Sequence, residues 1–426
     1  MNTRIATRSV LSAALVLAAL VGAAGCSAPK QESKSVAAVT GKYAFWPLAP
    51  DEPRIQFLGS FSSSEDVSPT QSSNLERIVF GKDTVKAAYV NKPYGVAMRD
   101  GKIYVCDIRA KALVVLDLAK KQTRLVGVSG VNRLERPVAV ALGEDGSAYV
   151  ADGVHAAILV FDKNERFVRS MQLPKLRPSS IALRGDRVYV SDIARQQVLV
   201  LDRTTGKEIG AIGSVGDGEG QFRLPVGIAL DKEGNLFVAD MMQCRVQKFS
   251  AEGKFIGVFG EQGDHAGGFA RPKQLAVDPE GIIYVVDAGF QNVQMFNDQF
   301  QLLMHFGAGG DFPGAMNLPV GLAITDTGLD VLKDRLHPGF KARRLIVVAN
   351  QFGDDKISVY ALGDRRPEYS MADMAASSLS VGSGVIVPSA ETLKFQNIGG
   401  IEPGQEDPAP AAAEPAPKSP AQPVSK

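Results

Sequence analysis

The stretch KIYVCDI at Lys102–Ile108 decides the fold, because its pattern of β-branched and aromatic residues before an aspartate returns along the chain. A single copy would indicate only one buried strand. Related stretches are SAYVADG at 147–153, RVYVSDI at 187–193, NLFVADM at 235–241, IIYVVDA at 282–288 and, more loosely, LIVVANQ at 345–351. The six related strands predict an internal repeat.

A second feature recurs in phase with this strand. It is a proline followed by a short apolar run, as in KPYGVAM from Lys92 onward. The prolines are Pro93, Pro137, Pro178, Pro225, Pro272 and Pro319, and successive ones are 41 to 47 residues apart. This regular spacing predicts six units of similar structure.

Each unit predicts an antiparallel sheet of four strands, named a to d, in about 45 residues. Strand a begins at the proline, and an Asp-Gly or Glu-Gly turn, which supplies positive φ, connects it to the aspartate strand b. Strands c and d follow, and no unit shows a helical period. Such a sheet has two apolar faces, and stacking around an axis covers both. We therefore expect an all-β, six-bladed β-propeller over residues 45–400.

The ends of the repeat predict how the ring closes. The last unit stops after its c strand ISVYAL at 357–362 and turns polar. The segment RIVFG at Arg77–Gly81 lies before the first proline and could supply the missing d strand, so that an N-terminal strand closes the ring. The segment PRIQFLGSF at 53–61 is a second candidate for this closure.

The repeat pattern Pro-x-Gly-[Val/Ile]-Ala, Tyr-Val-Ala-Asp and Phe-Gly resembles the NHL repeat. Over roughly residues 45–360 the chain is similar to bacterial NHL-repeat lipoproteins, which form six-bladed β-propellers. The resemblance implies the fold and says little about chemistry, because function depends on the site rather than on the scaffold.

The recurrent aspartate is expected to have an architectural role. A carboxylate at the end of strand b can accept hydrogen bonds from backbone N–H groups of the tight b–c loop. We therefore interpret these residues as structural turn residues rather than as a catalytic cluster. They are Asp107, Asp152, Asp192, Asp240, Asp287 and the substitute Asn350.

Antiparallel pairing places the starts of the a strands beside the b–c loops, and we call this side of the ring the loop face. Basic residues precede four of the six prolines, and the loops add basic, sulfur-containing and aromatic side chains. The candidate binding residues are Lys92, Arg136, Arg177, Arg271, Ile108, Arg109, Arg195, Met241, Met242, Phe290 and Phe352. Because arginine and aromatic residues often anchor interfaces, we hypothesise that this face binds a protein or an anionic ligand.

Two alternatives remain open at this stage. The chain has no His-Glu-x-x-His, Cys-x-x-Cys or Gly-x-Ser-x-Gly motif, so no catalytic residue, metal or other cofactor is predicted. Of the four histidines, His155 is best placed to face a site. A propeller lyase or hydrolase with a metal at the axis is one alternative, and a structural scaffold in an envelope complex, such as one with redox proteins, is the other.

The ends of the chain predict export. Residues 1–25 have the basic start and short apolar run of a signal peptide. Cys26 follows the residues AAG, which are similar to the lipobox of bacterial lipoproteins; this implies a lipid anchor, with 26–44 as a polar tether. Ser27 is compatible with sorting to the outer membrane of the bacterial envelope.

The tail and the charge complete this picture. Residues 401–426 are rich in proline and alanine and are predicted to be disordered. A formal charge of +1 gives no reason to expect nucleic-acid binding.

Two further expectations concern cysteines and an insertion. Cys106 and Cys244 belong to opposite blades, roughly 20 Å apart, whereas a disulfide needs Cα atoms within about 7 Å, so no bridge is expected. The insertion Thr327–Arg344 should project opposite the loop face, as a solvated loop or a second contact. Its basic residues are Lys333, Arg335, Lys341, Arg343 and Arg344.

Overall fold

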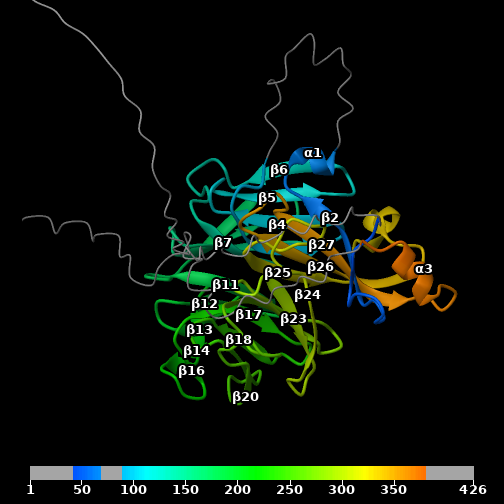
Figure 1. Ribbon diagram of the computed structural model, residues 1–426. Helices are drawn as coiled ribbons and strands as arrows, with labels where there is room; N and C mark the ends of the chain where they lie inside the picture. Colours follow the sequence, from blue (N-terminus) through cyan, green and yellow to red (C-terminus); the bar gives the residue numbers. More distant parts are fainter. Residues whose placement is uncertain (1–41, 69–88, 380–426) are drawn as a thin grey trace, which may run out of the picture. The chain divides into compact units, whose positions relative to one another are not determined.

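The computed structural model describes residues 42–68 and 89–379. These residues form six antiparallel sheets in a ring, so the fold is an all-β, six-bladed β-propeller, as predicted (Figure 1). Five sheets have four strands and the sixth has five. Each innermost strand contacts the next, and the last one, β25 (Pro319–Thr325), contacts the first, β3 (Pro93–Arg99).

In the first five blades the chain runs from the innermost to the outermost strand. Blade 1 consists of β3, β4 (Lys102–Asp107), β5 (Ala112–Asp117) and β6 (Gln122–Val126). Blade 2 consists of β7 (Pro137–Leu142), β8 (Ala148–Asp152), β9 (Ala157–Phe161) and β10 (Phe167–Gln172). Blade 3 consists of β11 (Pro178–Arg184), β12 (Arg187–Asp192), β13 (Gln197–Asp202) and β14 (Glu208–Ile212).

The same order continues in the next two blades. Blade 4 consists of β17 (Pro225–Leu230), β18 (Leu236–Asp240), β19 (Arg245–Phe249) and β20 (Phe255–Phe259). Blade 5 consists of β21 (Pro272–Val277), β22 (Ile283–Asp287), β23 (Asn292–Phe296) and β24 (Leu302–Phe306). A small parallel pair, β15 (Ser214–Val215) and β16 (Gln221–Phe222), lies in the link between blades 3 and 4.

The two repeated landmarks of the sequence lie opposite each other in every blade. In blade 1, Pro93 pairs with Asp107, and in blade 6 Pro319 pairs with Asn350. The remaining pairs are Pro137 with Asp152, Pro178 with Asp192, Pro225 with Asp240, and Pro272 with Asp287. The start of each inner strand therefore lies beside the end of its b strand, on the loop face.

The a–b turns have the backbone conformation that their sequence predicts. In the turn of blade 1, Asp100 and Gly101 have φ angles of 50° and 73°. Positive φ at both central residues is the geometry that matches the right-handed twist of two paired strands. The short Asp-Gly turn thus fixes the register of β3 on β4.

The core is divided among the spaces between neighbouring blades. Six clusters of buried apolar side chains occur in the described residues, and each is shared by two adjacent sheets. Between blades 1 and 2, for example, Cys106 and Leu113 share a cluster with Val150 and Leu159. A blade therefore buries both of its faces only when a neighbour stands on each side.

Blade 6 is completed by a segment far away in the sequence. Its strands are β25, β26 (Phe340–Asn350) and β27 (Ile357–Arg365), and β2 (Ile55–Phe61) pairs antiparallel with β27 (Figure 1). The two-residue strand β1 (Phe45–Trp46) then pairs with β2. The place predicted for Arg77–Gly81 beside β27 is thus occupied by β2, the second candidate; residues 77–81 lie outside the described part of the chain.

The insertion in blade 6 is more ordered than the expected loop. It contains a 3₁₀ helix, η1 (Leu329–Arg335), and its last residues belong to β26, which begins at Phe340 and pairs as far as Arg365 on β27. Both strands are therefore longer than the sequence indicated, because each supplies the other's hydrogen bonds beyond the repeat.

Two short helices flank the ring-closing strands. They are α1 (Ser64–Val67) and α3 (Met371–Ala376), and each begins with a capping box, in which Ser63 and Ser370 are the N-cap residues. The α3 segment packs beside β26, where Met374 and Phe340 share a buried cluster. No helix of the described residues has the length and apolar character needed to cross a membrane.

Candidate functional site

The recurrent aspartates tie each b–c loop to the start of strand a. Asp152, which is fully buried, accepts hydrogen bonds from the backbone N–H groups of Glu135 and Arg136, just before β7. It also accepts bonds from the N–H groups of Val154 and His155 in the b–c loop. Asp107 and Asp287 make the same four kinds of bond. The oxygen atoms of these carboxylates are therefore occupied by hydrogen bonds from backbone N–H groups.

The environment of the carboxylate differs between blades. Burial raises the pKa of Asp287, although its four backbone donors act in the opposite direction. Asp192 accepts from Arg177, Ala194 and Arg195 N–H groups. Asp240 accepts from the N–H groups before β17 and from the side-chain amide of Gln243.

Asn350 does not reproduce the bonds of the aspartates. Its Nδ2 donates to the carbonyl oxygen of Asp355 at 2.8 Å and to Ser358 Oγ at 3.1 Å. Its Oδ1 has no hydrogen-bond partner among the described residues. Because an amide offers a donor that a carboxylate lacks, Asn350 joins its loop to strand c rather than to strand a.

Four basic residues directly precede the prolines of the inner strands. They are Lys92, Arg136, Arg177 and Arg271, and Leu224 and Leu318 take these places in the other two blades. Arg136 and Arg177 are exposed, and Lys92 and Arg271 are partly buried. Within residues 42–68 and 89–379, none of the four cationic groups takes part in an ion pair.

These four residues stand on the loop face, at the starts of four inner strands. The residue after each proline lines the axial channel, and the pre-proline residue stands one position before the inner strand begins. Arg136 acts electrostatically on Tyr94, and Arg271 on Lys273; both of these partners line the channel.

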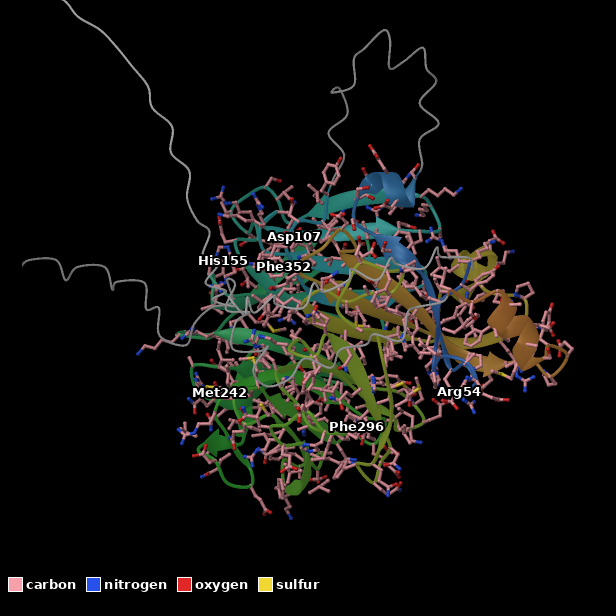
Figure 2. All side chains as sticks on the ribbon, viewed as in Figure 1. Arg54, Asp107, His155, Met242, Phe296 and Phe352 are labelled. Atoms are coloured by element: carbon pink, nitrogen blue, oxygen red, sulfur yellow. The ribbon has the colours of Figure 1, made fainter. Side chains whose placement is uncertain are left out.

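The b–c loops carry exposed apolar groups around these cations. Met242 is 57% exposed and Phe352 is 44% exposed, and both lie on the side of the sheets away from Arg54 (Figure 2). The loop of blade 2 adds Val154, which is 62% exposed. The sequence analysis did not predict this residue, because nothing in the sequence distinguishes it from an ordinary loop residue. Exposed apolar side chains on a common face are typical of an interaction surface.

The other predicted loop residues differ in how accessible they are to a binding partner. Arg109 is exposed, whereas Ile108, Met241 and Phe290 are partly buried, and Ile108 packs on the core between blades 2 and 3. Arg195 is bound to Glu208, with Nη1 2.8 Å from Oε2, and also lies near Asp192. The predicted binding set is thus brought to one face, but Arg195 already has carboxylate partners.

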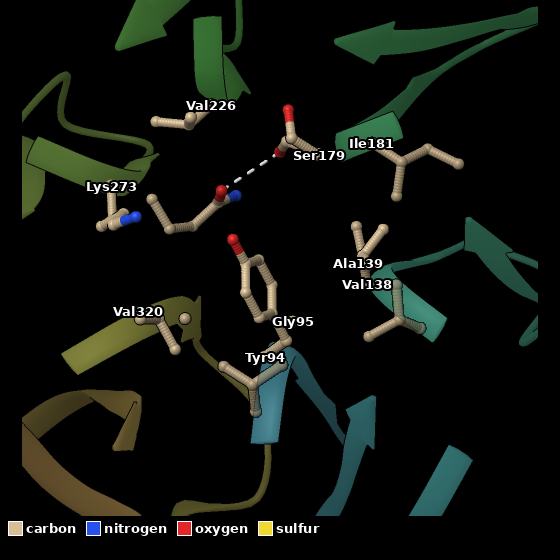
Figure 3. Close-up of a pocket in the computed structure, with 14 residues that line it drawn as sticks. Tyr94, Gly95, Val138, Ala139, Ser179, Ile181, Val226, Lys273 and Val320 are labelled. Carbon is tan, nitrogen blue, oxygen red and sulfur yellow. Dashed lines mark hydrogen bonds between the residues drawn. The ribbon is translucent and has the colours of Figure 1, made fainter. Parts of the chain in front are cut away.

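The axial channel is filled by side chains from all six inner strands. The residues after the prolines are Tyr94, Val138, Ser179, Val226, Lys273 and Val320, and they converge on a common centre (Figure 3). Gln274 crosses this space, and its Oε1 accepts a hydrogen bond of 3.1 Å from Ser180 Oγ. The remaining cavity is about 20 Å³, enough for about one or two water molecules.

Lys273 is the one charged side chain among the residues that line this channel. Figure 3 shows Lys273 at the wall of the channel, and no hydrogen-bond or ion-pair partner occurs for its amine in the described part of the chain. Burial, together with the charge of Arg271, lowers the pKa of Lys273 to about 8. Sequence analysis missed this residue; the signal is a lysine where the other repeats have Tyr, Val or Ser.

The histidines do not gather at the axis. His155 Nε2 lies 2.8 Å from the carbonyl oxygen of Arg133, and His265 lies 3.2 Å from Glu261 in the link before blade 5. His305 belongs to β24, and His337 is buried below η1. Across residues 42–68 and 89–379, no group of three or more His, Cys, Asp or Glu side chains could hold a metal ion.

The two cysteines of the ring are free and buried in different clusters. Burial raises the pKa of the Cys106 thiol well above its ordinary value and that of Cys244 to about 11. Cys26, the predicted lipidation site, lies outside the described residues.

The insertion Thr327–Arg344 was considered as a second contact surface because of its five basic residues. Not all of these residues are available for such a contact. Arg344 is 6% exposed and is bound to Asp326, Glu280 and Asp278, so it joins blades 5 and 6. The Arg335 guanidinium donates to the carbonyl oxygen of Leu58 and stacks on Phe61. For Arg344 the expectation of a solvated loop or contact surface is wrong, because its side chain is buried between two blades, whereas Arg335 remains exposed while it makes these contacts.

Comparison with known proteins supports the same fold. A family model described as a 6-bladed beta-propeller matches residues 175–251, within blades 3 and 4. A solved protein of unknown function from Bacteroides thetaiotaomicron is 15% identical to this chain, with a TM-score of 0.50 over 64% of this chain and 70% of that one. The chain is thus a β-propeller with six blades.

Two further solved structures are more distant in shape. Virginiamycin B lyase from Staphylococcus aureus is 11% identical, with a TM-score of 0.44 over 66% of this chain and 87% of that one. Regucalcin, a calcium-binding protein from Agrobacterium tumefaciens, is 13% identical, with a TM-score of 0.43 over 65% and 91%. At these identities the likeness concerns the fold alone.

Proposed function

We propose that this chain is an NHL-type β-propeller, held in the bacterial envelope by a lipid on Cys26, that binds a partner protein through its loop face. The observation that carries the proposal is a set of four cations at the starts of the inner strands that have no ion-pair partner in the described residues; they are Lys92, Arg136, Arg177 and Arg271. Their positive charge favours a partner with an acidic surface, since complementary potentials steer association and select the orientation of the complex.

The apolar residues of the same loops support a protein partner rather than a small solute. Val154 and Met242 are exposed on loops tied to the buried Asp152 and Asp240, and Phe352 is exposed on the loop that Asn350 joins to strand c. A rigid surface loses little conformational entropy on binding, and burial of apolar side chains contributes about 25 cal/mol per Å². The cations then set orientation and the apolar side chains add to affinity.

Site-specific crosslinking in the native envelope tests this function. A photoreactive amino acid at position 242 or 352 is expected to give a discrete adduct, whereas the same residue at position 341, which is exposed on β26, is expected to give none. Adducts of equal yield from all three positions would contradict a docking surface on the loop face.

Charge reversal separates binding from folding. In the triple variant Arg136→Glu, Arg177→Glu and Arg271→Glu, the adduct should be lost while the thermal unfolding curve stays nearly unchanged. The reason is that these guanidinium groups have no carboxylate partners in the described residues, so their replacement breaks no internal ion pair. A variant that crosslinks as well as the parent would overturn the proposal.

The lipid anchor is tested separately. Replacing Cys26 by Ser should release the protein from membranes into the soluble envelope fraction, and mass spectrometry of the parent should show an acylated N-terminal cysteine. An unprocessed or unacylated Cys26 in the parent would remove this part of the proposal and leave the loop face untouched.

A further inference from the structure

The axial channel holds a positive charge without a counter-charge. Lys273 lies in the channel wall, and no residue that lines the channel is acidic. Asp287, which ends the b strand of the same blade, is buried and bound to backbone N–H groups, and Asp278, five residues after Lys273, is bound to Tyr284 and lies beside Arg344. A desolvated ammonium group that lacks a partner is unfavourable, because burial disfavours the charged form.

The surroundings of Lys273 increase this imbalance. Arg271, two residues earlier and just before β21, adds a second positive charge nearby, and its repulsion contributes to the low pKa of Lys273. Arg136 acts on the hydroxyl group of Tyr94, which points to the centre of the channel in Figure 3. Arg136 of blade 2 and Arg271 of blade 5 thus each act electrostatically on a residue that lines the channel.

The available space limits what could neutralise this charge. The channel itself has room for about one or two water molecules, and its narrow part is blocked by Gln274 and by the valines of three blades. The channel is therefore too narrow for an organic molecule to pass, and an oxyanion that neutralises Lys273 has to bind outside this cavity, at the end of the channel nearest to the amine. Carboxylate and phosphate oxygens are the acceptors that match guanidinium and ammonium donors.

We propose that the mouth of the axial channel is a binding site for a small oxyanion, a carboxylate or phosphate group, held by Lys273, Arg271 and Arg136. The group comes either from a free anion or from an acidic side chain of a docked partner. The site does not require the protein partner of the proposed function, and each can fail without the other.

Protonation of the Lys273 amine and binding of the anion are thermodynamically linked. An anion favours the protonated Lys273, so its binding raises the pKa of the amine, and the affinity for the anion is highest below pH 8. The affinity should fall as the pH rises through about 8, because the neutral amine no longer contributes its charge.

Chemical labelling of lysines measures the site directly. The purified chain is treated with acetic anhydride at pH 7.5, and acetylation of each lysine is followed by mass spectrometry at constant ionic strength. Phosphate or citrate at 10 mM, an order-of-magnitude choice for a weak anion site, is expected to lower the labelling rate of Lys273 at least about fivefold. Lys341, which is exposed on β26, is the internal control and should be unaffected.

Two variants and a peptide make the result decisive. The double variant Arg136→Glu with Arg271→Glu should abolish the protection of Lys273 from acetylation. Hexaglutamate peptide is the probe for an acidic side chain of a partner, and phosphate or citrate is the probe for a free anion. The probe that protects Lys273 at the lower concentration identifies the source of the bound group. If the reagent does not reach Lys273, calorimetric titration of citrate into the parent and into Lys273→Met decides, with at least about a tenfold weaker affinity expected in the variant. Equal citrate affinity in both, or labelling unchanged by every anion, overturns the proposal.

Discussion

Gly227 on β17 lies so close to the backbone carbonyl oxygen of Lys273 on β21 that a Cβ atom placed on Gly227 would be 2.2 Å from that oxygen. Gly95 and Gly321 hold the same position in their strands, and a Cβ on them would likewise meet the backbone of the next blade, at 2.7 and 2.3 Å. The small residue two places after the proline thus lets the inner strands approach closely, which keeps the axial channel narrow.

Gly227→Ala is therefore expected to destabilise the ring. The added methyl group meets backbone, which cannot rotate away, so unfolding in denaturant should show a loss of at least about 1–3 kcal/mol. Gly210→Ala is the matched control, because nothing lies within 4 Å of a Cβ at that position of β14. Equal midpoints for the two variants would contradict the close approach of the inner strands.

Removal of an aspartate from a b–c corner should have a large effect. Asp152→Ala leaves four backbone N–H groups without their acceptor, and the expected loss of unfolding free energy is about 2–4 kcal/mol. Asp152→Asn keeps one oxygen and should lie between this variant and the parent. Asp311→Ala, at an exposed position, is the control and should stay within about 0.5 kcal/mol. A loss no greater than that of the control would argue against an architectural aspartate.

Lys273→Met is expected to stabilise the protein at pH 7. The folded chain releases the Lys273 proton near pH 8 and the unfolded chain near pH 10.5, so the unfolded state binds more protons between these values. The stability of the parent, relative to that of the variant, should therefore rise with pH across this window. Denaturant unfolding at pH 7 and pH 10 should show the variant's advantage shrink from about 1–3 kcal/mol toward zero. An advantage that does not depend on pH would point to packing rather than to charge.

Arg344→Met should weaken the contact between blades 5 and 6. The variant leaves Asp278, which is 3% exposed, without its nearby cation, and loss of one partner of a buried pair typically costs about 3–5 kcal/mol. Arg343→Met, at the exposed neighbouring position, is expected to change stability by less than about 0.5 kcal/mol. Thermal melting of both variants provides the comparison, and a similar small effect in each would mean that the Arg344 network contributes little.

The repeat was readable from the sequence because each unit repeats the same local physics. Pro93 and Asp107 predicted the ends of paired strands, and the structure places these residues opposite each other. Asp100 and Gly101 predicted the tight turn, since few residues tolerate positive φ. The apolar strands between these marks predicted two buried faces, and hence a ring of blades.

The closing strand could not be assigned with the same security. Arg77–Gly81 and Ile55–Phe61 are both apolar segments before the first blade, and short strands of similar composition compete equally in a pattern. The choice of Ile55–Phe61 depends on pairing with β27, more than 290 residues away, as Phe61 with Ile357 illustrates. Long-range pairing leaves no local mark in the sequence.

The sequence by itself determined six sheets, their order and the face that gathers the pre-proline cations, because alternation and turn chemistry are local properties. Only the tertiary structure decided which side chains remain free. Arg195 and Arg344 look like the other arginines in sequence but meet carboxylates, whereas Lys273 enters a narrow channel that contains none. The reason is that charge compensation and desolvation depend on neighbours from other blades, which come together only when the ring is formed.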